Sequence, residues 1–333
     1  MGFRSLPETT RKIYARILVV AALLSIFVTI AYLLNFMALD APTYYDSSRI
    51  LDNRHIFTNQ GVHGVVKIFL QRPVAMITFY FNYLIHDLNP YYFRLTNILL
   101  LAVTGLLVAF ILELLLSIEC RRDMMTDNER HVISIMIATL FVAHPLNTYV
   151  TIYIWQRMAL LASLFTYAGL AVYLATRLEI WNNAKIGYAT CILLFLCGLL
   201  SKENAVILPL ILILAEIAFF HPNWRHTVLR CFVFGIITVG VAIAMSWLER
   251  AHGTSQIKDG IVGTLQQYYL EADRSLLEVL LTQTRVFFIY LHSIFFPTLD
   301  STQLMRHFSV SISLKIFCEH CFHSLPRLMV IHT

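Results

Sequence analysis

The sequence alternates between long apolar runs and short polar junctions. A helix rises about 1.5 Å per residue, so roughly 20 apolar residues cross a hydrocarbon core of about 30 Å. Eight runs approach or exceed that length: residues 17–39, 92–116, 132–150, 155–176, 186–200, 204–220, 227–248 and 279–297. The pattern therefore predicts an all-α membrane protein, a multi-pass helical bundle with about eight spanning helices.

One apolar stretch, residues 73–86, is too short to span. It lies between Arg72 and the Asn89-Pro90 pair, within a polar and aromatic segment at 40–91 that is too long to be a simple turn. An apolar stretch of this length is typical of an interfacial or re-entrant helix. We therefore expect short interfacial helices in this segment.

The composition fits a membrane protein and excludes several other classes. Of the 333 residues, 58% are hydrophobic and 14% are charged, and the mean hydropathy is +0.68. This balance excludes a soluble single domain, a disordered scaffold, a disulfide-rich secreted module and a collagen-like chain. The formal charge of +5 comes from Lys and Arg scattered at the ends of apolar runs, so we expect no nucleic-acid partner. The six Cys show no framework and predict no disulfide.

The basic residues predict the topology. Positive charges mark cytoplasmic segments, and four precede the first run: Arg4, Arg11, Lys12 and Arg16. The expected organisation is a cytoplasmic tail at 1–16, a membrane domain at 17–300 with outer loops at 40–91 and 249–278, and a divergent or truncated tail at 301–333. The first run is too long for a cleavable signal peptide.

Several charged residues should converge near the outer surface of the membrane. They are Asp46, Asp52, Arg157, Lys202, Glu203 and Arg285. Charges beside spans are costly and often functional. A carboxylate can accept the proton of a hydroxyl group, and cations can stabilise the charge that develops on a departing phosphate. The combination of carboxylates and cations at one membrane surface therefore predicts group transfer from a lipid-linked phosphate.

Each of these residues also has a structural interpretation. Asp46 follows two tyrosines and is typical of a turn or cap, and cations at helix ends commonly extend to the lipid headgroups. Lys202 and Glu203 could cap adjoining helices, and His144-Pro145 could end one. Cys318, Cys321 and His323 have the types of zinc ligands, but a lone Cys-x-x-Cys is a weak signal.

Several motifs, in order, resemble the GT-C superfamily of multi-pass glycosyltransferases, and more narrowly the bacterial branch related to the transmembrane, tetratricopeptide-repeat O-mannosyltransferases. The motifs cover about residues 17–314. They are Ala41-Pro-Thr-Tyr-Tyr-Asp46, Arg72-Pro-Val-Ala-Met-Ile-Thr-Phe79, Asn89-Pro-Tyr-Tyr-Phe-Arg-Leu-Thr-Asn97, Ala143-His-Pro-Leu-Asn147, Tyr153-Ile-Trp-Gln-Arg-Met158, Leu200-Ser-Lys-Glu-Asn204 and Leu281-Thr-Gln-Thr-Arg-Val286.

The resemblance implies an inverting enzyme that moves a sugar from a polyprenyl-phosphate carrier to a hydroxyl group of a protein, such as a pilin, or of a glycolipid. It implies that Asp46 is the catalytic base. Ser47 stands where relatives often have a second Asp, so Asp52 and Asp40 are substitutes. The residues implied to bind substrate are Arg157, Lys202, Glu203, Arg285, Tyr45, Asp52 and His144, with Tyr44 beside the sugar. Some relatives use a divalent cation and others do not.

The resemblance also implies a location in the bacterial inner membrane, among membrane lipids, with the active site on the periplasmic face.

Two other interpretations of the function remain. In a transporter or lipid flippase, Lys202 and Glu203 would be coupling charges, although inverted repeats are not visible. An inactive, truncated glycosyltransferase-like protein is the other, because the chain ends soon after Met305–Ser311, a loose match to a family element.

Overall fold

The computed structural model describes residues 8–40, 47–52, 54–68, 70, 72–120, 125–180, 183–220, 235–241 and 276–296, with a few isolated residues between 229 and 244. Every regular element in these ranges is a helix. The chain divides into two compact units, Met1–Lys258 and Asp259–Thr333, which are described separately. In the second unit the described element is α13 (Leu276–Phe295).

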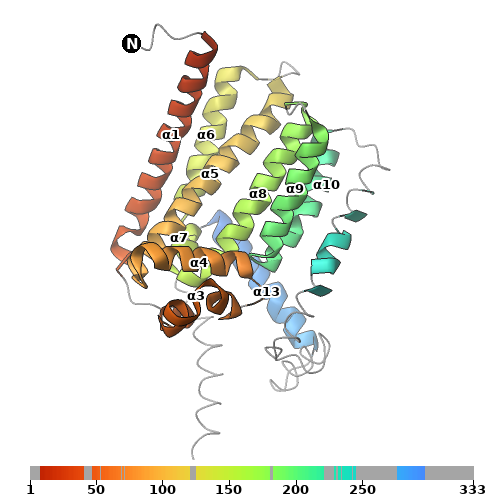
Figure 1. Cartoon of the computed structure of the whole chain (residues 1–333). Coiled ribbons are helices and arrows are strands. Elements are labelled where there is room, and N and C mark those ends of the chain that lie inside the picture. Colours follow the sequence, from red (N-terminus) through yellow and green to blue (C-terminus); the bar gives the residue numbers. More distant parts are fainter. Residues whose placement is uncertain are drawn as a thin grey trace, which may run out of the picture. The chain divides into compact units, whose positions relative to one another are not determined.

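The first unit is a bundle of long helices. They are α1 (Glu8–Asn35), α5 (Pro90–Cys120), α6 (Asp127–Ala143), α8 (Arg157–Arg177), α9 (Ala184–Leu199) and α10 (Leu208–Phe219). Helix α5 packs against α1, α6 and α8, and α8 packs in turn against α9 and α10. Figure 1 shows these helices running side by side. We call the end where α5 and α8 begin the Arg157 end, and the other the Glu113 end.

Short helices gather at the Arg157 end. They are α2 (Ser48–Leu51), α3 (Arg54–Ile68), α4 (Pro73–His86) and α7 (Leu146–Ile152), with 3-10 turns at Phe36–Ala38 (η2), Ile154–Gln156 (η4) and Glu203–Ile207 (η5). Helix α4 lies across the ends of the long helices (Figure 1). Its position and its length of 14 residues confirm the short helix expected at 73–86. Gly61, with φ 59° and ψ −153°, bends α3, a conformation that glycine adopts at little cost.

The described helices match part of the expected set of spans. Two are long and apolar enough to cross a membrane, Pro90–Ile118 and Ile154–Arg177, and a bent pair formed by α6 and α7 makes up to three. Shorter apolar helices lie at Ala22–Asn35, Ala184–Leu199 and Thr284–Phe295. The total of eight spans stays a prediction, because the expected span at 227–248 is described only in part.

The expected span at 132–150 corresponds to a bent pair of helices and not to one straight helix. Helices α6 and α7 meet at 61°, and His144, the residue after α6, has an extended backbone (φ −63°, ψ 129°). The cause is Pro145, whose ring disfavours helical geometry in the residue before it and which lacks an N–H. The alternative interpretation of His144-Pro145 as a helix end is thus confirmed.

The predicted domain boundaries stay predictions. Helix α1 begins at Glu8, so its first turns belong to the predicted tail at 1–16. The loop at 249–278 is described only from residue 276, where α13 begins. Residues 297–333, including Cys318, Cys321 and His323, lie outside the described residues.

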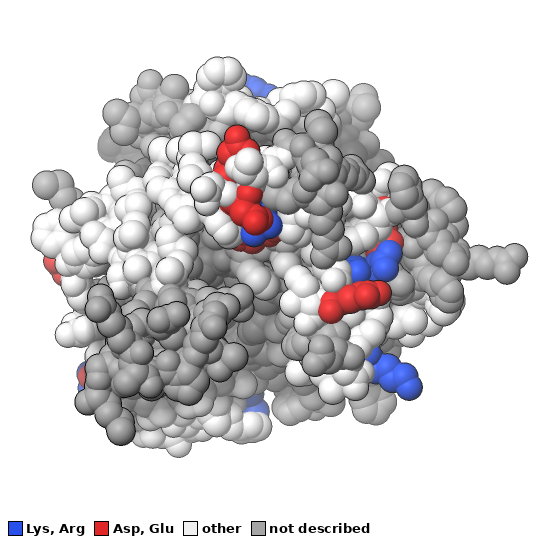
Figure 2. Space-filling model, turned by 90° about the horizontal axis from the view of Figure 1, so that it is seen from above, with Lys and Arg blue, Asp and Glu red and all other residues white. Residues whose placement is uncertain are grey.

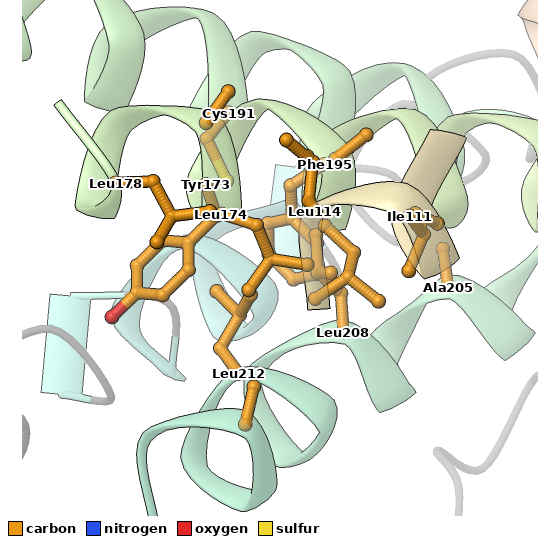
Figure 3. Close-up of a cluster of buried hydrophobic side chains, with 14 of the residues drawn as sticks. Ile111, Leu114, Tyr173, Leu174, Leu178, Cys191, Phe195, Ala205, Leu208 and Leu212 are labelled. Carbon is orange, nitrogen blue, oxygen red and sulfur yellow. The ribbon is translucent and has the colours of Figure 1, made fainter. Parts of the chain in front are cut away.

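The largest buried apolar cluster joins α8 and α9 to α5, η5 and α10 (Figure 3). Its centre includes Leu174, Phe195 and Leu208, each no more than 1% exposed. Gly198 lets α9 approach η5 closely, since a Cβ on it would lie 2.8 Å from Ala205 Cβ. Small residues at such contacts are typical of helix packing in membranes.

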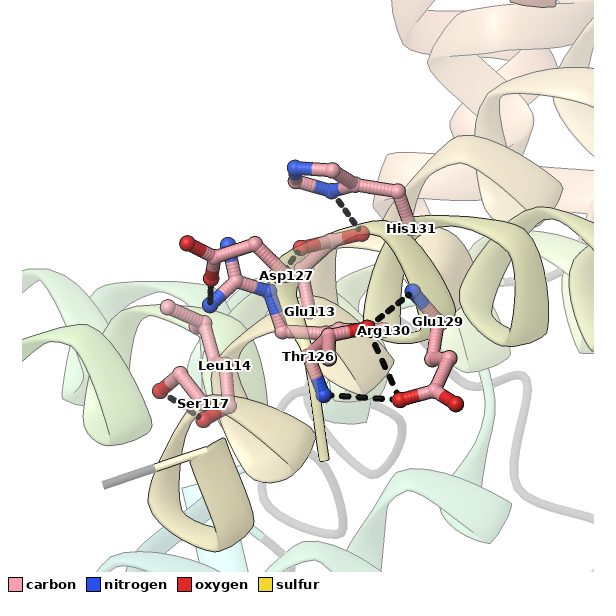
Figure 4. Close-up of polar contacts among 8 residues, drawn as sticks. All are labelled: Glu113, Leu114, Ser117, Thr126, Asp127, Glu129, Arg130 and His131. Carbon is pink, nitrogen blue, oxygen red and sulfur yellow. Dashed lines mark hydrogen bonds and ion pairs between the residues drawn. The ribbon is translucent and has the colours of Figure 1, made fainter. Parts of the chain in front are cut away.

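The Glu113 end has its own polar contacts (Figure 4). Glu113 of α5 accepts from Arg130 Nε and His131 Nδ1 of α6, at 2.9 and 2.8 Å. Thr126 and Glu129 form a capping box that starts α6. Seen from above in Figure 2, acidic and basic side chains lie beside one another in small groups on a mostly uncharged described surface. The contacts of Glu113 with Arg130 and His131 hold the end of α5 against the start of α6.

We predict that Gly105→Ala loosens the bundle. A Cβ at this position in α5 would overlap Val142 Cγ2 of α6 and lie 3.1 Å from Phe27 Cδ2 of α1. Overpacking of this kind costs about 1–3 kcal/mol, so the melting temperature in detergent should fall. Gly240→Ala is the matched control, because a Cβ there meets nothing within 4 Å. Equal melting temperatures for the two variants would contradict the packing described.

Candidate functional site

Arg157 lies fully buried at the Arg157 end and joins three helices. From the first position of α8, its Nε donates to Asn97 Oδ1 of α5 at 2.8 Å. Its Nη2 donates to Asn82 Oδ1 of α4 and to Phe93 O of α5, both at 2.8 Å. Its Nη1 donates to Thr78 O of α4 at 3.3 Å. Four of the five guanidinium N–H groups are therefore used to hold α4 and α5 against α8.

The surroundings of Arg157 are neutral among the described residues. Its hydrogen-bond acceptors are amide and backbone oxygens, and its Cζ lies 4.5 Å from the ring centroid of Phe79 and 5.2 Å from that of Phe93. A cation at a helix N-terminus is opposed by the helix dipole. Tertiary contacts, and not helix propensity, therefore explain this residue at this position.

A second set of polar contacts ties α1 and α7 to α5. Arg94, 1% exposed, donates to Leu39 O and, at 3.1 Å, to Ile152 O. Asn97 Nδ2 donates to Thr151 O at 3.2 Å, and Thr151 Oγ1 donates to Asn35 Oδ1 at 2.9 Å. These bonds satisfy backbone and side-chain groups where helices end, and they anchor the chain just before residue 41.

Two cations and a carboxylate meet where α4 begins. Arg72 Nη2 contacts both Glu203 oxygens, at 2.9 and 3.0 Å, and Arg72 Nη1 donates to Met158 Sδ at 3.2 Å. Val74 N also donates to Leu200 O at 3.3 Å. The start of α4 is thus attached to the 200–203 junction. Glu203 is 68% exposed at its side chain and Arg72 only 15%.

Lys202 belongs to the same group of charges. It is half-buried, and burial lowers the pKa of its ammonium group, with a smaller contribution in the same direction from the charge of Arg72. The neighbouring Glu203 carboxylate opposes this shift. Arg72, Lys202 and Glu203, which we call the cation cluster, therefore interact electrostatically although 130 positions separate Arg72 from Lys202.

The predicted catalytic residue, Asp46, lies outside the described residues, as do Tyr44 and Tyr45. The next part of the chain is described. Ser47 is 2% exposed, and Ile50 is buried in the apolar cluster that includes Met158, the side chain that Arg72 contacts. Asp52 is exposed. The segment that follows Asp46 therefore contributes to the same apolar cluster as Met158, which Arg72 contacts.

The other predicted site residues lie elsewhere. His144 ends α6, and its Nδ1 accepts from Leu146 N at 3.3 Å. Arg285 is an exposed residue of α13, in the second unit. Their roles in substrate binding stay predictions. No group of three His, Cys, Asp or Glu within the described part of the chain is placed to hold a metal ion, and the question of a divalent cation therefore rests on the resemblance.

Four residues of this region were not predicted as site residues: Arg72, Asn82, Arg94 and Asn97. Arg94 and Asn97 carried a signal that could have found them: two polar residues, three apart and so on one helix face, inside an apolar run. Asn82, in α4, has the same character. Arg72 was noted as the boundary of a short apolar stretch and as the first residue of one resemblance motif, without a role in the site.

We predict that Arg157→Lys destabilises the protein. A single ammonium cannot reach acceptors on both α4 and α5 as the planar guanidinium does, and each buried acceptor left without a donor costs about 1–3 kcal/mol. The melting temperature should fall clearly. Arg54→Lys is the control, because its ion pair with Asp87 is exposed and such pairs contribute about 1 kcal/mol or less. A similar effect of both variants would contradict the role given to Arg157.

The lowered pKa of Lys202 predicts that its amine reacts with acylating reagents at a lower pH than an ordinary lysine does. Because burial disfavours the ammonium form, the neutral amine should appear at a lower pH than in a lysine peptide. Mass spectrometry after acylation at a series of pH values measures this. Arg72→Gln should move the profile only part of the way back, since burial is the larger cause. A wild-type profile that coincides with that of the peptide would contradict the geometry.

Comparison with known proteins gives distant relatives. Over 137 residues the chain is 29% identical to "Protein O-mannosyl-transferase TMTC3" of Homo sapiens, covering 40% of this chain and 13% of that protein. Over 181 residues it is 26% identical to "Protein O-mannosyl-transferase Tmtc3" of Drosophila melanogaster, covering 48% of this chain and 19% of that protein. The chain thus matches less than a fifth of the length of these relatives. No family model matches the chain, and no solved structure does. The chain is therefore distantly similar, over less than half of its length, to protein O-mannosyl-transferases.

Proposed function

We propose that this protein is a membrane glycosyltransferase of GT-C type. It would move a sugar from a polyprenyl-phosphate carrier to a hydroxyl group of a protein or glycolipid acceptor. The observation that carries the proposal is the cation cluster at the Arg157 end, where Arg72 contacts Met158 of the apolar cluster that also contains Ile50. The distant similarity to protein O-mannosyl-transferases supports the same reaction class.

The proposed chemistry is a displacement at the anomeric carbon of the sugar. The Asp46 carboxylate takes the proton of the acceptor hydroxyl, whose oxygen then forms the new bond to the anomeric carbon as the bond to the phosphate oxygen breaks. The phosphate leaves on the carrier with an added negative charge. Lys202 and Arg72 stabilise that charge, as cations placed at a departing phosphate do.

The cation predicted earlier as a phosphate ligand, Arg157, acts differently in this proposal. Its guanidinium is fully buried and four of its N–H groups are used by protein acceptors. We assign it to positioning: it fixes α4, whose first residues carry Arg72, against α8. Its charge has neutral partners among the described residues, so it also favours an anion nearby.

The location and the acceptor follow from the resemblance. A periplasmic active site in a bacterial inner membrane stays a prediction, and the relatives reported above come from a human and a fly. The proposal requires only that the Arg157 end face the compartment that holds the lipid-linked sugar.

Asp46→Asn should abolish most sugar transfer, because proton transfer by a positioned carboxylate contributes typically 10²- to 10⁴-fold. The measurement is transfer of labelled sugar from a polyprenyl-phosphate donor by the purified chain in lipid nanodiscs. Asp127→Asn, a change of the same chemistry on an exposed carboxylate at the Glu113 end, should leave transfer unchanged. If Asp46→Asn transfers sugar at the wild-type rate, the assignment of the base is wrong.

A further inference from the structure

We propose that Arg72 is a ligand of the donor phosphate and that Glu203 is an internal anion that occupies Arg72 until the donor binds. This inference rests on the proposed function and deepens it. It assigns a residue that the sequence analysis left without a role, and it changes the role of Glu203 from a substrate ligand to a competitor of the substrate.

The two partners of the ion pair differ in exposure. The Glu203 side chain is 68% exposed, whereas that of Arg72 is 15% exposed. Glu203 is already largely hydrated, so its carboxylate changes its solvation little when it turns into water. Arg72 is mostly enclosed, and an enclosed guanidinium interacts more strongly with an anion than an exposed one does.

The position of Arg72 is fixed by neighbours other than Glu203. Its Nη1 donates to Met158 Sδ, and its backbone carbonyl accepts from Met76 N at 3.1 Å. Arg72 also directly precedes α4, with Pro73 in the first turn, so partial positive charge of the helix N-terminus adds to that of the guanidinium. When Glu203 moves away, the guanidinium stays in place.

A phosphate fits this position better than a carboxylate. The planar guanidinium presents paired N–H groups that match phosphate oxygens, and the neighbouring charge of Lys202 adds a second cation. A bound phosphate and the Glu203 carboxylate repel each other, so they compete for Arg72. Glu203 stands at the start of η5, from which its exposed side chain can turn into water.

The competition has a measurable size. An ion pair worth about 1 kcal/mol or less keeps the Arg72 guanidinium occupied by Glu203 for only part of the time. The apparent affinity for the donor phosphate is then reduced in proportion to the fraction of molecules in which Arg72 is open. Glu203→Gln should therefore tighten the binding of polyprenyl phosphate by about two- to sixfold. Because Glu203 is exposed, this variant is expected to fold normally.

The experiment measures binding of polyprenyl phosphate to the full chain in phosphatidylcholine nanodiscs. Four proteins are compared with wild type: Glu203→Gln, Arg72→Gln, the double variant and Asp87→Asn. Arg72→Gln should weaken binding, and in its background Glu203→Gln should give no gain. Asp87→Asn is the matched control, because it removes another exposed carboxylate in an arginine pair near the same end and should leave binding unchanged. Neutral polyprenol should bind all five proteins equally.

Several outcomes would overturn the inference. Unchanged or weaker binding by Glu203→Gln would show that the carboxylate is a structural partner or a ligand, and an equal gain in Asp87→Asn would show an unspecific charge effect. Failure of both wild type and Glu203→Gln to bind polyprenyl phosphate would also overturn it. If Glu203→Gln binds inorganic phosphate more tightly than polyprenyl phosphate, the ligand of Arg72 is a free phosphate and not the lipid-linked donor.

A parallel transfer assay separates this inference from the proposed function. If wild type transfers sugar but Glu203→Gln binds the donor no more tightly, the competition fails and the transferase proposal stands. If the variants show the expected order of binding and no sugar is transferred from any polyprenyl-phosphate donor, the phosphate site stands and the transferase proposal fails.

Discussion

The Arg157 end depends on one buried guanidinium. Arg157 donates to acceptors on α4 and α5 from the first position of α8, and no local preference of the helix explains a cation there. Burial of a charge is costly unless its hydrogen bonds are made, so the acceptors must stay in place. This requirement fixes α4 across the bundle and sets the position of Arg72, which precedes α4 in the chain.

The same constraint explains how residues from distant parts of the chain meet. Arg94 and Asn97 of α5 donate hydrogen bonds to backbone carbonyl oxygens at the ends of other helical segments. These acceptors belong to Leu39, Thr151 and Ile152. The 200–203 junction is attached to the start of α4 through Leu200 and Glu203. Polar groups that cannot be left unsatisfied in an apolar surrounding therefore bring the helix ends together, and the cation cluster results.

The sequence predicts the helices better than it predicts their ends and partners. Apolar length located α5, α8, α9 and α13, and bounded α4 as a short helix, because length and hydropathy are local properties. The bend at Pro145 had a local signal that the apolar run obscured. The partners of Arg157 had none: Asn82 and Asn97 become its acceptors only through the packing of three helices. The pairing of Arg72 with Glu203 likewise depends on the fold, so the sequence supplied the charges and not their arrangement.

The proposed binding site of the donor phosphate lies at the Arg157 end, where Arg72 and Lys202 supply positive charge. A cryo-electron microscopy structure of the chain in nanodiscs with polyprenyl phosphate bound tests this directly. We expect phosphate density in contact with the Arg72 guanidinium and the Lys202 ammonium, with the Glu203 carboxylate turned into solvent. Density at the Glu113 end, near Arg130, or a phosphate at the Arg157 end with the Arg72–Glu203 pair intact, would contradict it.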